Sequence, residues 1–151
     1  MKDYKDDDYF AGLADGEGCF HIARQSLSAI RFGFHLSQRV SPISTMLLQE
    51  LQVTFGGRIY THHDHKAETL HWQWSVHSQE DVVGLITYFD KHPLRLKALE
   101  YQVWREAVLL YYTNSVGRGG GRTPKWLTDQ ITIYNATLQQ LKKYIKPTSG
   151  E

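Results

Sequence analysis

Apolar and polar residues alternate along four segments of the chain. Residues 30–38, IRFGFHLSQ, show this most strictly: the even positions from 30 to 36 are apolar, and the odd positions are polar or glycine. Segments 19–25, 56–63 and 69–77 follow the same period of two. This period is typical of half-buried antiparallel strands. The sequence therefore predicts two hairpins, one turning at residues 26–29 and the other at DHKAE.

Helical spacing of apolar residues occurs before, between and after these hairpins. We predict helices over residues 8–17, 41–55, 78–92, 93–113 and 126–145. Asp8 is a candidate N-cap, Ser41 precedes a proline at the first helical position, and Ser78 begins a capping box with Asp81. The resulting order, αββαββααα, describes an α+β fold. In such a fold a four-stranded antiparallel sheet carries its helices on one face and leaves the other face uncovered.

Composition narrows the classes of function. The chain has 151 residues, 41% of them hydrophobic, which suits one globular domain. Its single cysteine, Cys19, excludes an internal disulfide and an all-cysteine zinc site. No run of about 18 apolar residues occurs, so neither a membrane span nor a membrane partner is predicted.

Acidic residues are concentrated at the N-terminus. Residues 1–8 hold four of the 16 acids and two of the 17 basic residues, so the remainder has 15 basic and 12 acidic residues, or +3. The string DYKDDD is either the remnant of a common epitope tag, which it resembles, or a native acidic turn before a helix N-terminus. We divide the chain into this segment at 1–8, one domain over 9–146 and a tail at 147–151.

The polar face of the predicted strands contains arginine, glutamine, histidine and tyrosine but no carboxylate. These residue types suit phosphates and base edges, and antiparallel strands fit a DNA major groove. The basic, glycine-rich loop 114–125 adds candidate phosphate contacts. An ordinary solvated face and a plain linker are the alternatives. The candidate DNA-binding residues are His21, Gln25, Arg31, His35, Arg58, Tyr60, His62, His71, Gln73, Arg118 and Arg122.

The leading helix combines glycines with carboxylates. Gly12 and Gly16 lie four residues apart, and with Ala11 they form a surface that another helix can approach closely. The motif occurs once, so its natural partner is a second copy of the chain. A two-fold axis through this contact would bring two Glu17 carboxylates together, and these would need a hard cation such as Mg²⁺.

This stretch resembles the signature of the LAGLIDADG homing endonucleases. The string FAGLADGEG matches it at Ala11, Gly12, Leu13, Asp15 and Gly18, with a carboxylate at Glu17. The following ββαββα order and the segments GGRIY, HWQWSV and HPLRLKALEYQVWREAV extend the resemblance over about residues 9–145. It implies the family's αββαββα fold, with a saddle-shaped sheet and extra C-terminal helices. The single motif implies the homodimeric branch.

The resemblance also implies roles for individual residues. Glu17 takes the position of the divalent-metal ligand, with Gly16 beside it in the metal site, and the implied cofactor is Mg²⁺ or Mn²⁺. Gln38 resembles the polar residue that positions water. Lys97 resembles the basic residue that helps to activate water or stabilise the scissile phosphate, with Arg95 and Arg39 as alternatives. Asp15 takes a structural position near a dimer interface formed by Ala11, Gly12, Asp15 and Gly16.

The implied activity is homing endonuclease activity of an intron-encoded type. A homodimer would bind double-stranded DNA at a long near-palindromic site and cut one strand per subunit by metal-assisted hydrolysis. An intron RNA maturase or a cleavage-inactive DNA-binding protein of the same fold is the alternative, and an intact Glu17 favours the endonuclease. A third hypothesis is a histidine metal site at His62, His63, His65 and His71, although zinc sites usually include cysteines.

Overall fold

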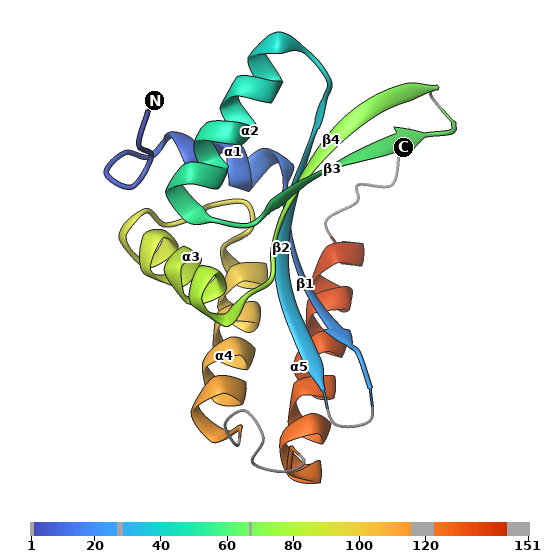
Figure 1. Cartoon of the computed structure of the whole chain (residues 1–151). Helices are drawn as coiled ribbons and strands as arrows, with labels where there is room; N and C mark the ends of the chain where they lie inside the picture. The colour runs from blue at the N-terminus through green and yellow to red at the C-terminus, as the bar shows by residue number, and fades with distance from the viewer. Residues whose placement is uncertain (1, 27–28, 67, 116–122, 145–151) are drawn as a thin grey trace. The chain divides into compact units, whose positions relative to one another are not determined.

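The structure is a computed structural model, which describes residues 2–26, 29–66, 68–115 and 123–144. Its elements are α1 (Tyr9–Glu17), β1 (Gly18–Arg24), β2 (Ile30–Arg39), α2 (Pro42–Phe55), β3 (Arg58–Asp64), β4 (Thr69–Val76), α3 (Gln79–Lys91), α4 (Ala98–Asn114) and α5 (Lys125–Tyr144) (Figure 1). The strands form one sheet in the order β1-β2-β4-β3, and β4 pairs antiparallel with both β2 and β3. The predicted α+β fold and the order of its elements are confirmed. No helix within the described ranges is long and apolar enough to cross a membrane.

The chain forms two compact units, each of which is described separately. The first comprises Met1–Cys19 and Gly33–Leu96, and so contains α1, α2, α3, the β3–β4 hairpin and most of β2. The second comprises Phe20–Phe32 and Lys97–Glu151, with most of β1, the start of β2, α4 and α5. Both β1 and β2 therefore contribute residues to each unit.

The core of the first unit is a cluster of aromatic rings around Phe10 of α1. Phe10 is fully buried, and its ring centroid lies 4.7–5.9 Å from those of Phe34, Phe55, Trp74, Tyr88 and Phe89. These rings come from β2, α2, β4 and α3, so one side chain of α1 contacts four other elements of the unit. Burying a phenylalanine contributes about 1.5–3 kcal/mol, and each favourable ring pair adds about 0.5–1.5 kcal/mol.

Tyr88 connects this core to the acidic N-terminal segment. Its hydroxyl donates a hydrogen bond to the Asp7 carbonyl oxygen at 2.7 Å and accepts one from the Ala11 backbone N–H at 3.0 Å. Burial raises the pKa of Tyr88 to about 12, so the hydroxyl keeps its proton throughout the neutral pH range. Tyr88 therefore bonds the backbone both before and after Tyr9, the first residue of α1.

Two further side chains hold the acidic segment against the first unit. Tyr4 is buried, and its hydroxyl donates to Glu50 Oε2 at 2.8 Å. The His92 ring places Nδ1 2.6 Å from Asp8 Oδ1 and Nε2 3.1 Å from the Lys5 carbonyl oxygen. In this structure the segment thus packs on the first unit, whereas the sequence predicted for it only an acidic turn or a tag remnant.

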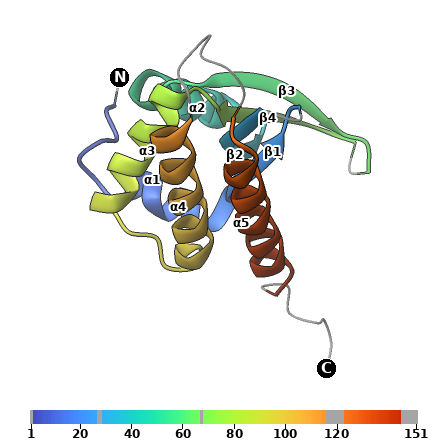
Figure 2. The same cartoon turned by 90° about the horizontal axis from the view of Figure 1, so that it is seen from below.

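The second unit buries its strand residues against two long helices. Phe20 packs on Trp104 at 4.9 Å between ring centroids, and Phe32 packs on Tyr111 at 5.4 Å. From α5, Lys142 Nζ donates to the Phe20 carbonyl oxygen at 2.5 Å. The helices α4 and α5 lie side by side (Figure 2). The alternation predicted for 19–25 and 30–38 is confirmed by the burial of its apolar positions, which are Phe20, Ile22, Ile30 and Phe32 in this unit and Phe34 and Leu36 in the first.

The helix predicted to begin at residue 93 begins instead at Ala98. The Asp15 carboxylate accepts the backbone N–H groups of Arg95 and Leu96, at 3.2 and 3.0 Å. This attachment holds the chain before Ala98 in an irregular conformation, although its residue types allow a helix.

Gly33 also differs from prediction: it is buried rather than exposed, because it lies on an inner strand and presents only backbone.

The predicted helix starts hold in part. Ser41 accepts from the Ser44 N–H, and Pro42 occupies the first turn of α2 as predicted. The Ser78 side chain accepts from the Asp81 N–H, as predicted. The second bond of a capping box, from the Ser78 N–H to the Asp81 side chain, is not found at this described helix start. Asp8 precedes α1 without a side-chain cap bond, because its carboxylate faces His92 instead.

No loop separates α1 from β1, since Glu17 ends the helix and Gly18 begins the strand. A Cβ atom on Gly18 would lie 2.6 Å from two atoms of the Phe34 ring and 2.7 Å from the Ala14 carbonyl oxygen. Such distances are shorter than side chains tolerate, so only glycine allows this direct junction.

Gly18→Ala is therefore expected to destabilise the protein by about 1–3 kcal/mol, the usual cost of overpacking. Gly84→Ala is the matched control, because Gly84 lies in α3 with no atom within 4 Å of an added Cβ. That change should stabilise the helix by about 0.5–1 kcal/mol. Urea unfolding at equal protein concentration measures both, and equal effects of the two variants would contradict the close approach at Gly18.

Candidate nucleic-acid interface and catalytic site

The register of β2, β4 and β3 builds three cross-strand rows of polar side chains in the first unit. The alternate positions Phe34, Leu36 and Trp74 are fully buried, so the rows lie on the opposite face of the sheet. Directly paired side chains on one face have Cβ atoms about 4.5–5.5 Å apart. The rows are His35, Ser75 and Arg58; Ser37, Gln73 and Tyr60; and Arg39, His71 and His62. None of these nine positions carries a carboxylate.

The side chains in the rows differ in their exposure and in whether they already form hydrogen bonds within the chain. Arg58, Tyr60 and His62 are exposed, whereas Gln73 and His71 are half-buried. The Gln73 amide donates to Ser75 Oγ at 3.1 Å. His71 Nε2 lies 2.9 Å from Thr69 Oγ1, and Thr69 belongs to the same strand. The exposed edge along β3 is therefore the more accessible part of the face.

Sequence reasoning missed three members of these rows. Ser37 and Ser75 were not proposed as DNA-binding residues, and Arg39 was named only as an alternative to Lys97. The period of two continues from His35 through Ser37 to Arg39, so extending the strand prediction by one residue finds Arg39. The inclusion of Ser75 depends on its pairing with both His35 and Arg58, which the sequence does not specify.

The remaining DNA-binding candidates belong to the second unit or lie outside the described residues. His21 is half-buried, and its carbonyl oxygen accepts from Trp104 Nε1 at 3.2 Å. Gln25 and Arg31 are exposed on either side of the β1–β2 turn. Arg118 and Arg122 lie outside the described residues.

The exposed surface of α1 presents the predicted glycines and the predicted metal ligand. Gly12 and Gly16 are exposed, and a Cβ added to either would have no atom within 4 Å. Glu17 is exposed at the last position of the helix. Ala11, predicted to lie in the same interface, is instead buried in the first unit, with 5% of its surface exposed. The two glycines are thus the part of the predicted interface that faces open space.

A groove of about 410 Å³ runs beside this helix. It is bordered on one side by α1 and on the other by the irregular segment before α4, which Asp15 holds in place. Its lining residues are Asp8, Ala11, Gly12, Asp15, Pro93, Leu94 and Arg95. Asp15 therefore anchors the backbone of this segment. Lys97, the predicted basic residue of the site, is half-buried and directly precedes α4.

Gln38 occupies the end of β2 on the face opposite the polar rows. It is half-buried and pairs in register with Trp72, whose Nε1 donates to Thr45 Oγ1 of α2 at 2.8 Å. Its neighbour Arg39 belongs to the third row. The predicted water-positioning residue, Gln38, therefore lies on the opposite face of the sheet from the predicted DNA-binding residues.

The donor set at the end of α1 suits a hard cation. Glu17 supplies an exposed carboxylate, and the last carbonyl groups of a helix carry partial negative charge. Mg²⁺ and Mn²⁺ prefer such oxygen ligands and retain bound water. Within the described residues no group of three or more His, Cys, Asp or Glu side chains converges on one point. Glu17 alone would leave most coordination positions of such a cation to other oxygen ligands.

The histidines of the β3–β4 hairpin do not converge. His63 and His65 place their Nδ1 atoms 3.1 Å apart. His62 pairs with His71 on the face of the polar rows, whereas His63 pairs with Leu70 and points to the other face. The structure therefore divides the cluster that the histidine metal-site hypothesis requires.

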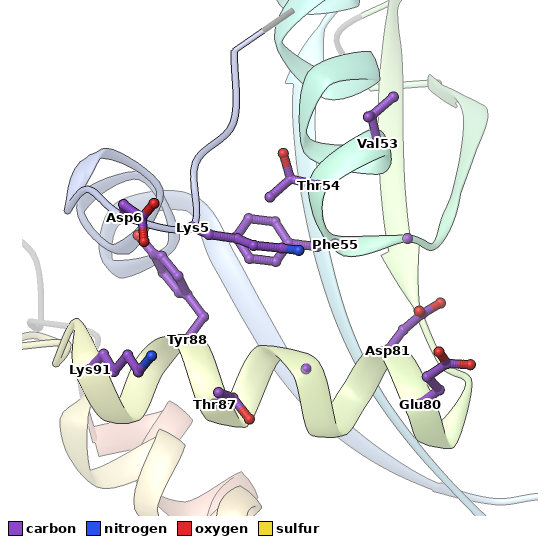
Figure 3. A pocket seen from close by; sticks show the side chains of 12 residues that line it. Lys5, Asp6, Val53, Thr54, Phe55, Glu80, Asp81, Thr87, Tyr88 and Lys91 are labelled. Atoms are coloured by element: carbon purple, nitrogen blue, oxygen red, sulfur yellow. The ribbon is translucent and has the colours of Figure 1, made fainter.

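A larger pocket of about 600 Å³ lies between the N-terminal segment, α2 and α3 (Figure 3). In this view Lys5 crosses the middle of the pocket, Lys91 lies toward one end, and Glu80 and Asp81 lie at the other. Among its described lining residues there is none that the sequence predicted for the site.

Comparisons with known proteins agree with this arrangement. The model of a family described as LAGLIDADG endonuclease matches residues 10–108. That range extends from the start of α1 into α4 and contains the whole sheet. No curated protein sequence matches the chain.

Several solved structures share the fold. The homing endonuclease I-TnaI has 19% identity and a TM-score of 0.68, over 92% of this chain and 97% of that chain. The meganuclease I-AabMI, solved bound to uncleaved DNA, has 23% identity and a TM-score of 0.68, over 84% of this chain but only 44% of its own. An archaeal intron-encoded homing endonuclease complexed with DNA has 16% identity and a TM-score of 0.66, over 95% and 84% of the two chains.

The TM-scores of these structures establish a common fold. The family model establishes membership, because it matches well over half of the sequence, including most of α1 with its glycines and carboxylates. The chain belongs to the LAGLIDADG endonuclease family.

Proposed function

We propose that this protein is a site-specific DNA endonuclease that acts as a homodimer and cuts one strand with each subunit. The observation that carries the proposal is the exposed surface of α1, where two glycines with open space precede an exposed carboxylate at the helix end. Each glycine costs about 1 kcal/mol in a helix relative to alanine. A helix-to-helix contact is a physical reason to retain them.

The homodimer explains how one carboxylate per chain can serve a metal site. A two-fold axis along the glycine surface brings the Glu17 residues of two copies together, and their mutual repulsion favours a bound cation. Glu17 and the Gly16 carbonyl oxygen would hold Mg²⁺ or Mn²⁺, which when bound supplies polarised water and neutralises charge at the scissile phosphate. The same axis makes the two DNA half-sites equivalent, so the target is near-palindromic.

Other residues of the chain would support hydrolysis without holding the cation. Gln38 offers an amide that can orient a water molecule by hydrogen bonding. Lys97 offers an ammonium group that stabilises the negative charge developing on the phosphate. These two assignments rest on the local resemblance of the segments LSQR and PLRLK to the family, outside the signature itself.

The acid-free rows of the sheet would bind the DNA. Arginine and histidine contacts to phosphates supply most of the affinity, whereas glutamine, serine and tyrosine side chains can read base edges. The solved relatives that are complexed with DNA support this partner. Double-stranded DNA is therefore the proposed substrate.

A cleavage-inactive DNA-binding protein or an intron RNA maturase of the same fold is the competing function, because the polar rows could serve either one. Two facing carboxylates repel each other and so destabilise a helix-to-helix contact. A protein that only binds nucleic acid has no use for them. Glu17 therefore favours the nuclease. The genomic context provides a direct test, because joining the exons that flank an intron gives the expected target.

Glu17→Gln should bind the target with unchanged affinity but lose cleavage by about 10²–10³-fold, the usual effect of removing one electrostatic contribution to a transition state. The measurement is Mg²⁺-dependent cutting of a labelled duplex that carries the intron-insertion site. Glu80→Gln is the control, because Glu80 is an exposed acid in the first turn of α3. Full cleavage by Glu17→Gln would show that the metal assignment is wrong.

Gly12→Leu should prevent dimerisation, because its side chain would fill the space that a second helix needs. Gly84→Leu is matched in that both residues are exposed helical glycines with open space around them. Sedimentation velocity of both variants, with and without DNA, compares their association states. A dimeric Gly12→Leu protein would contradict the proposed interface.

The double variant His62→Ala/His71→Ala should bind target DNA about tenfold more weakly, since each lost hydrogen bond contributes about 0.5–1.5 kcal/mol. His63→Ala/His65→Ala removes two histidines of the same hairpin that lie outside the polar rows and should leave the affinity unchanged. Fluorescence anisotropy at fixed salt measures both affinities. Equal losses would place the DNA elsewhere than on the polar rows.

A further inference from the structure

We propose that Gln73 reads an adenine of the DNA target through its side-chain amide, and that Ser75 orients this amide. Both residues belong to β4, which pairs with β2 on one side and β3 on the other, and both lie within the first unit. The inference rests on the proposed function, in which the polar rows bind double-stranded DNA. Gln73 would thus be a specificity-determining residue of the binding face.

Gln73 occupies the centre of the nine positions in the polar rows. It pairs in register with Ser37 of β2 and with Tyr60 of β3. The two arginines of the rows, Arg39 and Arg58, are exposed and lie at diagonally opposite corners. In a regular sheet these corners are about 16 Å apart, whereas a major groove is about 12 Å wide. The arginines can therefore contact phosphates at both edges of a groove while the central amide faces the bases.

A hydrogen bond within β4 sets the orientation of the Gln73 amide. Gln73 Nε2 donates to Ser75 Oγ at 3.1 Å. Ser75 has only 3% of its surface exposed, so the protein rather than solvent holds this hydroxyl in place. The bond uses one of the two hydrogens of the amide, whose remaining hydrogen-bonding capacity is the acceptor Oε1 and the second hydrogen.

This remaining capacity matches one base of the major groove. Adenine presents the acceptor N7 beside the N6 amino donor, and a glutamine amide can bind both at once. Guanine presents two acceptors, N7 and O6, which are bound best by two donor hydrogens. An amide that gives one hydrogen to serine has only one left for a base. The bond to Ser75 therefore favours adenine over guanine.

The central strand also restricts the Gln73 side chain before DNA binds. Gln73 is half-buried between two neighbouring strands, whereas Tyr60 on the edge strand is 47% exposed. A side chain that is already ordered loses less conformational entropy on binding. Gln73 is thus better suited to reading a base than the exposed side chains around it, which are suited to phosphate contacts.

A base-by-base binding profile tests the assignment of Gln73. Fluorescence anisotropy in EDTA, where no cutting occurs, compares the target with each of its single-base-pair substitutions. The unaltered protein should prefer adenine at one position of each half-site by about 5–150-fold, the discrimination of one bidentate contact. Gln73→Ala should abolish this preference and leave the other positions unchanged. Gln73→Glu should prefer cytosine there, because a carboxylate accepts from the cytosine N4 amino group.

Ser75→Ala tests the orientation of the amide. Without the serine hydroxyl the amide can turn and offer both hydrogens to a base. Guanine should then bind nearly as well as adenine at the Gln73 position, while pyrimidines at that position stay disfavoured. A purely structural role of Ser75 would instead weaken binding to every duplex by the same factor.

Gln49→Ala is the matched control. Gln49 is an exposed glutamine of α2 in the same unit, and it lines a groove with Ile59 and Trp72 rather than belonging to the polar rows. Its variant should reproduce the profile of the unaltered protein. Urea unfolding identifies any variant that loses stability, and Gln73→Glu keeps the size of the side chain, so its change of preference does not depend on lost packing.

The outcomes separate the inference from the proposed function. An unchanged profile for Gln73→Ala, or a base other than adenine preferred at the position that this variant alters, would overturn the assignment of Gln73. An unchanged profile for Ser75→Ala would overturn the orienting role of Ser75. Failure of the unaltered protein to distinguish the target from a scrambled duplex of equal length and composition would instead reject the proposed function itself.

Discussion

The burial of Phe10 is the interaction on which the arrangement of the first unit depends. Its ring meets aromatic rings from β2, α2, β4 and α3, and so fixes the rotation of α1 about its own axis. Once that rotation is set, Gly12, Gly16 and Glu17 point away from the core. The core and the proposed dimer surface are therefore two sides of one short helix.

The order of elements could be predicted from the sequence because local patterns determine it. Period-two alternation identified the strands, and Ser41 with Pro42 identified the start of α2. The start of α4 could not be predicted in this way, because it depends on bonds from Asp15 to residues 80 and 81 positions away in the chain. Local propensity contains no information about such a partner.

The candidate site was predictable to a similar extent. Residue type and alternation identified His62, Arg58 and Tyr60 as members of a polar face, but only the register shows that Arg39, His71 and His62 form one row. The pattern also grouped four histidines that the hairpin then separates between its two faces. Periodicity predicts which face a strand residue occupies, whereas pairing determines its neighbours across the sheet.

The direct junction between α1 and β1 has a consequence for the evolution of target choice. A single peptide bond joins Glu17 to the strand that begins at Gly18, and the packing of Gly18 on Phe34 leaves that bond little freedom. Under the proposed function, the placement of the metal ligand Glu17 relative to Gly18, the first residue of the strand, is set by covalent geometry. Substitutions farther along the strand can then alter which bases are recognised without displacing the metal ligand.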